Sequence, residues 1–356
     1  MEKQFPIKQL LDPQGNWISD EHRELLTEDR TKEFYQHMIR IRTFDRKGIS
    51  LQRQGRIGTY APFEGQEASQ VGSALALGKG DWMFPTYRDH GATITFGHSL
   101  RNVLLFWNGR NDGNVPPEGL NIFPPGIPIA TQLPHAAGAA FAEKRKGTKN
   151  AAIAYFGDGA TSEGDFHEGL NFASVFKAPV VFFNQNNQFA ISVPISKQMN
   201  TKTIAQKALA YNIPGVRIDG NDIFAVYVEM LNALERARNG DGPTLIEAVT
   251  WRYGAHTTAD DPTKYRDQNE SSMRREETDP ILRLERCMKN NGWFDEAWAK
   301  QVAAEAEIEI NRAVDEMEQY PKPDPAVIFD FVFEKPTNSI EKQKRELLHV
   351  LRGDES

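Results

Sequence analysis

Two short runs of oxygen-bearing side chains each follow an apolar, strand-forming run. GDG stands at 157–159 and NQNN at 184–187. Because the carboxyl ends of parallel strands share one edge of a sheet, and open α/β sheets bind ligands there, the two runs are expected to meet. Asp158 and Asn187 would bring hard oxygen ligands together. Mg²⁺ prefers such ligands and takes the rest of its shell from water and substrate phosphates.

A second cluster with chemical potential is YRDHG at 87–91. Arg88 offers a planar fork of donors suited to a diphosphate, and Tyr87 adds a hydroxyl beside it. From these residues alone, an ion pair between Arg88 and Asp89 explains the arginine better. For His90 two interpretations remain open, a pocket residue and a helix-cap residue.

A third cluster is RYGAHTTADD at 252–261, which follows a strand-like run at 243–251. Its polar, turn-prone composition predicts a loop at the same sheet edge. An isolated histidine in such a loop is usually a surface residue. His256 could nevertheless act chemically, since the pKa of histidine lies near neutrality and the ring both donates and accepts protons.

Alternating strand and helix patterns must position these clusters. Phe34, Met38, Ile41 and Phe44 recur at helical spacing. Apolar runs rich in β-branched and aromatic residues predict strands at 151–156, 179–183 and 243–251. This alternation predicts an α/β fold with a mainly parallel sheet and helices on both faces.

Other segments carry weaker expectations. Glycines predict a turn at 48–58, and five prolines with four glycines predict an irregular loop at 109–128. Residues 203–215 are expected to form a helix. Prolines lead into a strand-like run within 321–333, and an amphipathic pattern predicts a short helix at 341–353.

Composition excludes several classes of protein. The 356 residues are 39% hydrophobic and 26% charged, with a formal net charge of −7 that argues against a nucleic-acid partner. No apolar stretch approaches the ~20 residues of a membrane span, and no secretory signal pattern is visible. Cys287 is the single cysteine, so no internal disulfide can form. We expect a cytoplasmic protein.

Competing phosphate and metal motifs are absent from the sequence. The glycines after 157 do not make GxGxxG, no GK[ST] occurs, and zinc-type Cys/His spacing is missing. GDG followed by NN at about one βαβ crossover is instead the thiamine diphosphate signature. With the other two clusters in the same order, the chain resembles alpha subunits of the thiamine-diphosphate-dependent decarboxylating component of 2-oxo acid dehydrogenase complexes. The bacterial pyruvate dehydrogenase type is most similar.

The resemblance covers about residues 30 to 335. It implies an N-terminal arm at 1–30, a thiamine diphosphate-binding domain at 31–335 and a C-terminal helical tail at 336–356. The fold it implies is the diphosphate-binding domain of thiamine enzymes, an α/β fold.

The resemblance also implies ligands for the cofactor and its metal. Asp158, Asn187 and the backbone carbonyl of Phe189 would bind Mg²⁺. Gly159 and Ala160 would offer backbone N–H groups at a helix start to the phosphates. Phe189 lacks the hydroxyl that some relatives carry there, but a backbone ligand does not need one.

Other site residues follow from the same match. Tyr87 and Arg88 would contact the diphosphate, and Ile129 would lie near the aminopyrimidine. His256 would contact both the cofactor and the reacting intermediate, and it is the predicted catalytic residue. Thr257 stands where some relatives carry a regulatory phosphorylated serine, without a recognisable kinase context here.

The activity implied is oxidative decarboxylation of pyruvate with transfer of the acetyl unit to the lipoyl group of an acyltransferase core. Such alpha subunits work with a beta subunit as α2β2, and the beta subunit supplies the activating glutamate. Glu64 and Glu67 are therefore interpreted as acidic residues that oppose the dipole at a helix start. The chain alone is expected to be catalytically silent.

Three alternatives remain open from the sequence. YFGDGATSEGDFHEG at 155–169 and DGNDIFAVY at 219–227 look equally like branched-chain 2-oxo acid dehydrogenase alpha subunits. Acetoin dehydrogenase alpha subunits share the same core. A cofactor-free scaffolding subunit is the non-enzymatic alternative, which the intact Asp158 and Asn187 pair disfavours.

Overall fold

Parallel strands build the sheet in the computed structural model, which describes residues 5–353. Within those residues the main sheet has the order β1-β8-β9-β5-β4-β2-β3, and each neighbouring pair in it is parallel. Two further strands, β6 and β7, form an antiparallel hairpin. The strands are β1 (Ile7–Lys8), β2 (Trp82–Phe84), β3 (Asn121–Ile122), β4 (Ala152–Gly157), β5 (Val180–Asn186), β6 (Phe189–Ala190), β7 (Val193–Pro194), β8 (Gly215–Asp219) and β9 (Thr244–Val249).

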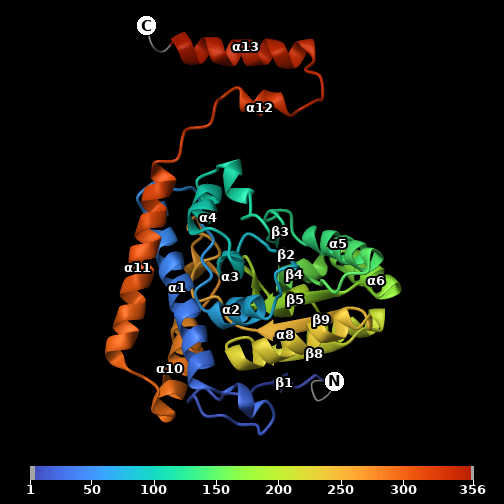
Figure 1. Cartoon of the computed structure of the whole chain (residues 1–356), viewed down its shortest axis with the longest axis vertical. Helices are drawn as coiled ribbons and strands as arrows, with labels where there is room; N and C mark the ends of the chain where they lie inside the picture. The colour runs from blue at the N-terminus through green and yellow to red at the C-terminus, as the bar shows by residue number, and fades with distance from the viewer. Residues whose placement is uncertain (1–4, 354–356) are drawn as a thin grey trace. The chain divides into compact units, whose positions relative to one another are not determined.

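Helices cover both faces of this sheet, as Figure 1 shows. On one face, Phe156 of β4 joins a core with Leu133 of α5 (Gln132–Lys146) and Leu170 of α6 (Gly164–Phe176). On the other face, the hydroxyl of Tyr155 lies 2.8 Å from Ser73 Oγ of α2 (Glu67–Leu75). A parallel sheet buried on both faces is the expected result of βαβ crossovers. The predicted α/β class is confirmed.

Side-chain caps mark the starts of several of the remaining helices. Asp222 precedes α8 (Ile223–Arg238), and its side chain accepts from the N–H groups of Phe224 and Ala225. Before α10 (Pro280–Asn290), the side chain of Asp279 accepts from the N–H groups of Ile281 and Leu282, and Pro280 takes the first helical position. The others are α1 (Glu28–Arg53), α3 (His90–Phe96), α4 (Leu100–Trp107), α7 (Ile195–Gln198), α9 (Gln268–Thr278), α10 (Pro280–Asn290), α11 (Glu296–Glu318), α12 (Val327–Asp330) and α13 (Asn338–Gly353).

The chain divides into two units between Val314 and Asp315, a boundary that α11 spans. The second unit contains α12 and α13, and the Lys344 ammonium of α13 pairs with Asp330 of α12. The bounds predicted at residues 30 and 335 stay predictions. The outer ends of the predicted arm and tail, residues 1–4 and 354–356, lie outside the described residues.

The turn predicted at 48–58 is wrong in its first half. Helix α1 continues to Arg53, and Gly48 lies inside it. A Cβ at Gly48 would lie 2.6 Å from a ring carbon of Tyr60. The glycine therefore serves close packing against a tyrosine ring rather than a chain reversal, and tertiary contact overrides its low helix propensity.

Two other predicted elements also differ. The helix expected at 203–215 is a 3₁₀ turn at Ala205–Tyr211, which ends at Asn212 with φ 53 and leads into β8. The strand-like run within 321–333 contains the short helix α12 followed by turns. Phe331 is 87% exposed there, so the run lacks the burial that favours strand pairing.

Register places the two functional strand ends together. Gly157, the last residue of β4, pairs with Gln185 near the end of β5, so Asp158 and Asn187 lie at one sheet edge. The loop 109–128 is irregular apart from a 3₁₀ turn and β3. None of the helices within residues 5–353 is both long and apolar enough to span a membrane.

Candidate active site

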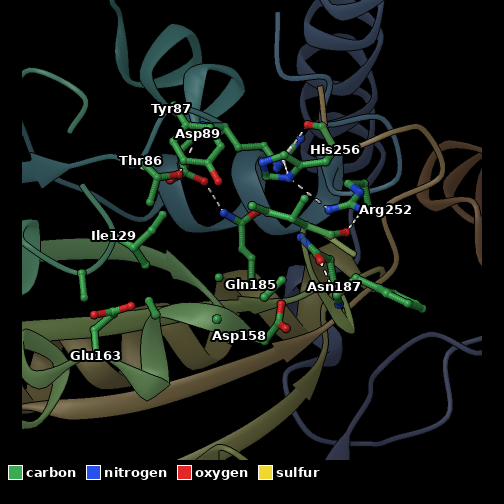
Figure 2. Close-up of a pocket in the computed structure, with 18 of the residues that line it drawn as sticks. Thr86, Tyr87, Asp89, Ile129, Asp158, Glu163, Gln185, Asn187, Arg252 and His256 are labelled. Carbon is green, nitrogen blue, oxygen red and sulfur yellow. Dashed lines mark hydrogen bonds between the residues drawn. The ribbon is translucent and has the colours of Figure 1, made fainter. Parts of the chain in front are cut away.

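A cavity of about 210 Å³ lies at the carboxyl edge of the sheet, and Figure 2 shows side chains from several segments around it. Every residue for which the sequence predicted contact with cofactor or metal lines this one cavity: Tyr87, Arg88, Ile129, Asp158, Gly159, Ala160, Asn187, Phe189 and His256. Their individual roles stay predictions. The fold nevertheless brings together residues as far apart in the sequence as Tyr87 and His256.

Asp158 stands directly after β4 and is 2% exposed. Its Oδ2 accepts a hydrogen bond from Gln198 Nε2 at 2.7 Å. Burial raises the pKa of this carboxyl above its ordinary value. A divalent cation would oppose that shift, because its charge favours the ionised carboxylate.

Asn187 follows β5 and is 6% exposed. Its Oδ1 accepts from the backbone N–H of Phe189 at 3.3 Å. The Phe189 ring packs edge-on against Trp251, with centroids 5.7 Å apart, which fixes the backbone that follows Asn187. One carboxylate, one amide oxygen and nearby backbone carbonyls match the oxygen ligands of Mg²⁺, so the donor set fits that ion.

Gly159 lies in a tight approach between two segments. A Cβ at this position would lie 2.7 Å from the Cβ of Ala190 in β6. The residues after β4 form a 3₁₀ turn, Asp158–Ser162, and α6 begins only at Gly164. The amides of Gly159 and Ala160 therefore belong to the turn rather than to the helix start that the sequence predicted.

Arg88 does not form the ion pair with Asp89 that its neighbours suggested. Asp89 instead accepts from Thr86 N at 2.7 Å and Thr86 Oγ1 at 2.6 Å, and Gln185 donates to its other oxygen. The Arg88 guanidinium donates to the carbonyl of Pro62 and to His256. The hydrogen bonds of Asp89 thus stabilise the turn at 86–89, from which the Arg88 side chain reaches the cavity.

His256 lies between two guanidinium groups. Its Nδ1 is 3.0 Å from Arg88 Nη2 and 3.4 Å from Arg252 Nη1. Burial and these two cations lower the pKa of His256 to about 3. The ring is therefore neutral at pH 7, and because both arginines are donors, Nδ1 accepts and Nε2 carries the proton. The near-neutral pKa expected from the residue type is wrong here.

Two glutamines line the cavity that the sequence did not single out. Gln66 is 0% exposed, and neither its Nε2 nor its Oε1 has a hydrogen-bond partner in the protein. Gln185 is 3% exposed, and its Oε1 is also unpartnered. Buried amide atoms without partners are costly, so a ligand or water must satisfy them. Gln185 could have been found from the sequence, because it belongs to the NQNN run at 184–187. Gln66 carried no comparable signal, since it is a single polar residue directly before α2.

Arg252 is a charged lining residue that the sequence did not assign to the site. It is 1% exposed, lines the cavity, and donates from Nη2 to the carbonyl of Ile191 at 2.9 Å. Burial and the neighbouring Arg88 lower the pKa of Arg252 to about 10, so it remains charged at pH 7. Its position at the start of the RYGAH segment could have indicated it.

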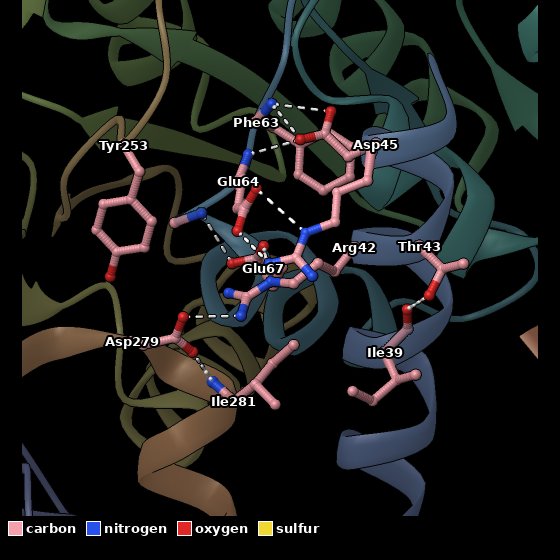
Figure 3. Close-up of polar contacts among 12 residues, drawn as sticks. Ile39, Arg42, Thr43, Asp45, Phe63, Glu64, Glu67, Tyr253, Asp279 and Ile281 are labelled. Carbon is pink, nitrogen blue, oxygen red and sulfur yellow. Dashed lines mark hydrogen bonds and ion pairs between the residues drawn. The ribbon is translucent and has the colours of Figure 1, made fainter. Parts of the chain in front are cut away.

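Glu64 and Glu67 do not line the cavity. Glu67 is the first residue of α2; its Oε2 accepts from Gly65 N at 3.0 Å and its Oε1 pairs with Arg42 at 2.7 Å. Glu64 pairs with Arg46 at 2.7 Å. Figure 3 shows both carboxylates engaged in this polar network. For Glu67, these contacts agree with the interpretation as an acidic residue at a helix start.

Comparison with known proteins places this site in a family. Residues 35–326 match the family model described as Dehydrogenase E1 component. The chain is 42% identical over 343 residues to "Pyruvate dehydrogenase E1 component subunit alpha" of Staphylococcus aureus (strain Mu50), which covers 96% of this chain and 92% of that protein. The protein of the same name from Staphylococcus epidermidis (strain ATCC 12228) gives the same values. This chain belongs to the dehydrogenase E1 component family.

Proposed function

We propose that the chain is the alpha subunit of a pyruvate dehydrogenase that works with thiamine diphosphate and Mg²⁺. One observation carries the proposal: Asp158 and Asn187 follow adjacent parallel strands and line the same cavity as Arg88 and His256. Pyruvate as the substrate is supported by the names of the staphylococcal relatives, which cover nearly the whole chain.

The metal and the diphosphate would be held at the sheet edge. Asp158, Asn187 and the carbonyl of Phe189 are the proposed Mg²⁺ ligands, and the amides of Gly159 and Ala160 are proposed to face the diphosphate. When bound, thiamine diphosphate supplies the carbanion chemistry by which a 2-oxo acid loses CO₂. The protein contributes binding, orientation and a largely buried setting.

His256 would act as a neutral hydrogen-bond donor. Arg88 and Arg252 hold its Nδ1 as an acceptor, which leaves the proton on Nε2. The two guanidinium groups also place positive charge in the cavity, where they can attract the diphosphate or the substrate carboxylate. We propose that His256 orients the reacting group and assists its transfer to a lipoyl group.

A beta subunit would complete the site, in an α2β2 assembly that delivers the acetyl unit to a lipoyl acyltransferase core. Ile129 is 43% exposed and Ile191 is 55% exposed, although both line the cavity. Exposed apolar side chains beside a ligand site support coverage by another chain. Glu64 and Glu67 are held in ion pairs, which supports an activating carboxylate from the partner.

Reconstitution tests the substrate and the need for a partner. The purified chain, alone and with its beta subunit, is assayed for CO₂ release from pyruvate and from 2-oxoisovalerate. We expect turnover only in the assembly and a higher kcat/KM for pyruvate. Turnover by the single chain, or preference for 2-oxoisovalerate, would contradict the proposal.

Calorimetry separates an enzyme from a scaffold. The assembly should bind thiamine diphosphate in the presence of Mg²⁺ and lose that dependence on the metal in Asp158→Asn. A scaffolding subunit would show no metal-dependent binding in either form.

A further inference from the structure

Asp45 is a fully buried carboxylate on α1, outside the cavity. It accepts hydrogen bonds from the Tyr60 hydroxyl at 2.8 Å, the Glu64 N–H at 2.9 Å and the Phe63 N–H at 3.1 Å. Figure 3 shows the hydrogen bonds from the backbone N–H groups of Phe63 and Glu64 to the Asp45 carboxylate. Since N–H and O–H groups donate strongly to an ionised carboxylate, these bonds fix the segment 60–64 on α1.

Segment 60–64 also binds Arg88, which lines the cavity. The carbonyl of Pro62 accepts from Arg88 Nη1. Arg88 Nη2 in turn donates to the carbonyl of His256 at 2.8 Å and approaches its Nδ1 at 3.0 Å. The direction in which Arg88 points is therefore set in part by where segment 60–64 lies.

Segment 60–64 also holds the loop that carries His256. Tyr60 donates from its N–H to Thr258 Oγ1 at 3.0 Å and accepts from Thr258 N at 2.8 Å. The carbonyl of Glu64 accepts from Tyr253 N at 3.2 Å. These bonds lie on both sides of His256 in the sequence, so they fix the loop before and after the histidine.

The approach between segment and loop is close. Gly65, directly after the segment, has φ +106, and a Cβ there would lie 2.5 Å from the carbonyl oxygen of Trp251. The backbones meet without an intervening side chain. Because a small shift of the segment would be transmitted directly to residues 251–258, the position of the segment determines the position of the loop.

We propose that Asp45 is a positioning residue, which holds Arg88 and the His256 loop in place through segment 60–64. It touches neither the cavity nor His256, and it acts by receiving the bonds that fix Tyr60, Phe63 and Glu64. The positioning of the loop is a property of the chain itself. Its consequence for cofactor binding rests on the proposed function.

A matched control exists within the same chain. Asp222 is also fully buried and accepts four backbone bonds, from Leu10, Leu11, Phe224 and Ala225. It caps α8, lies outside the cavity, and contacts neither segment 60–64 nor the His256 loop through these bonds. Asp222→Asn therefore reports what loss of a buried carboxylate does to general stability.

Hydrogen exchange on the full chain, with its beta subunit, tests the proposal without cofactor. In Asp45→Asn we expect amides in 251–260 to exchange about tenfold faster, with the start of α8 unchanged. In Asp222→Asn we expect faster exchange at 10–11 and at the start of α8, with the loop unchanged. Equal effects of the two variants on the loop would overturn the proposal.

Tyr60→Phe gives a second measurement if Asp45→Asn folds poorly. It removes one of the donors to Asp45, together with the contact of the same hydroxyl with His90 Nε2 at 2.7 Å. Loop exchange should then rise severalfold, and thiamine diphosphate should bind more weakly by a similar factor. Unchanged loop exchange in Tyr60→Phe would contradict the proposal. If the wild-type assembly itself binds no thiamine diphosphate, the proposed function fails, while the exchange result still decides the role of Asp45.

Discussion

Arg88 and His256 are joined at two points: one guanidinium nitrogen donates to the backbone carbonyl at 2.8 Å and meets the ring Nδ1 at 3.0 Å. The residues are 168 positions apart in the sequence. The backbone bond fixes where the histidine stands, and the ring contact fixes its tautomer. Together they make His256 a donor through Nε2 rather than an acid that titrates near pH 7.

Removal of the second cation should raise the pKa of His256. In Arg252→Met we expect the pKa to move from about 3 toward its ordinary value of 6.5, because one of the two nearby cations is lost. NMR titration of ¹⁵N-labelled histidine measures this, and His256→Gln identifies the signal. An unchanged titration would mean that burial and Arg88 hold the pKa of His256 low without a contribution from Arg252.

His256 should also make stability depend on pH. In the unfolded chain the ring binds a proton below about pH 6.5, but in the folded chain only near pH 3. The folded state therefore binds fewer protons in this window, and the free energy of unfolding falls as the pH drops through it. His256→Gln should lose less stability between pH 7.5 and pH 5, measured by urea unfolding. An equal loss in both proteins would contradict the lowered pKa.

Strand ends made it possible to predict that Asp158 and Asn187 lie close together. Asp158 and Asn187 each follow an apolar run, and parallel strands bring their carboxyl ends to one edge whatever the loops do. The roles of Tyr87 and His256 were predicted only from the family resemblance, because nothing in their local pattern specifies a partner far along the chain.

The remaining features depend on contacts that local patterns do not encode. From the sequence alone Gly48 predicts a turn, because the packing of the Tyr60 ring against it is not visible in the local pattern. The pKa of His256 depends on where Arg88 and Arg252 point. Gln66 looks like any polar residue at a helix start until its amide is seen to be buried without a partner.

Replacing Gln66 should separate stability from binding. Gln66→Met removes a buried amide that has no partner in the protein, so the unliganded chain should become more stable by about 1 kcal/mol. Binding of thiamine diphosphate or pyruvate should weaken, since the amide lines the cavity. Urea unfolding and calorimetry measure the two effects.

Gln70 provides the control for this prediction, one helical turn away. Its Nε2 donates to the carbonyl of Arg88 at 3.1 Å, and its Oε1 accepts from Ala92 N at 3.0 Å. Gln70→Met should destabilise the chain, because it leaves those two groups without partners. If both variants lose stability alike, ordered water satisfies the Gln66 amide in the unliganded chain and the prediction is wrong.

One substitution should create a clash between positions 159 and 190, and a second should relieve it. In Gly159→Ala the new Cβ would lie 2.7 Å from the Ala190 Cβ, so hairpin β6–β7 must move away from the turn that holds Asp158. We expect thiamine diphosphate to bind about tenfold more weakly, as a site displaced by a fraction of an ångström loses oriented contacts.

A second substitution shows whether the contact is the cause. Gly159 lies outside the left-handed φ region, so its backbone accepts alanine and only the clash opposes it. Ala190→Gly removes the opposing Cβ and should restore affinity in the double variant to within about threefold of wild type, while the single Ala190→Gly change has little effect. A double variant as weak as Gly159→Ala would show that the ligand itself needs the space beside Gly159.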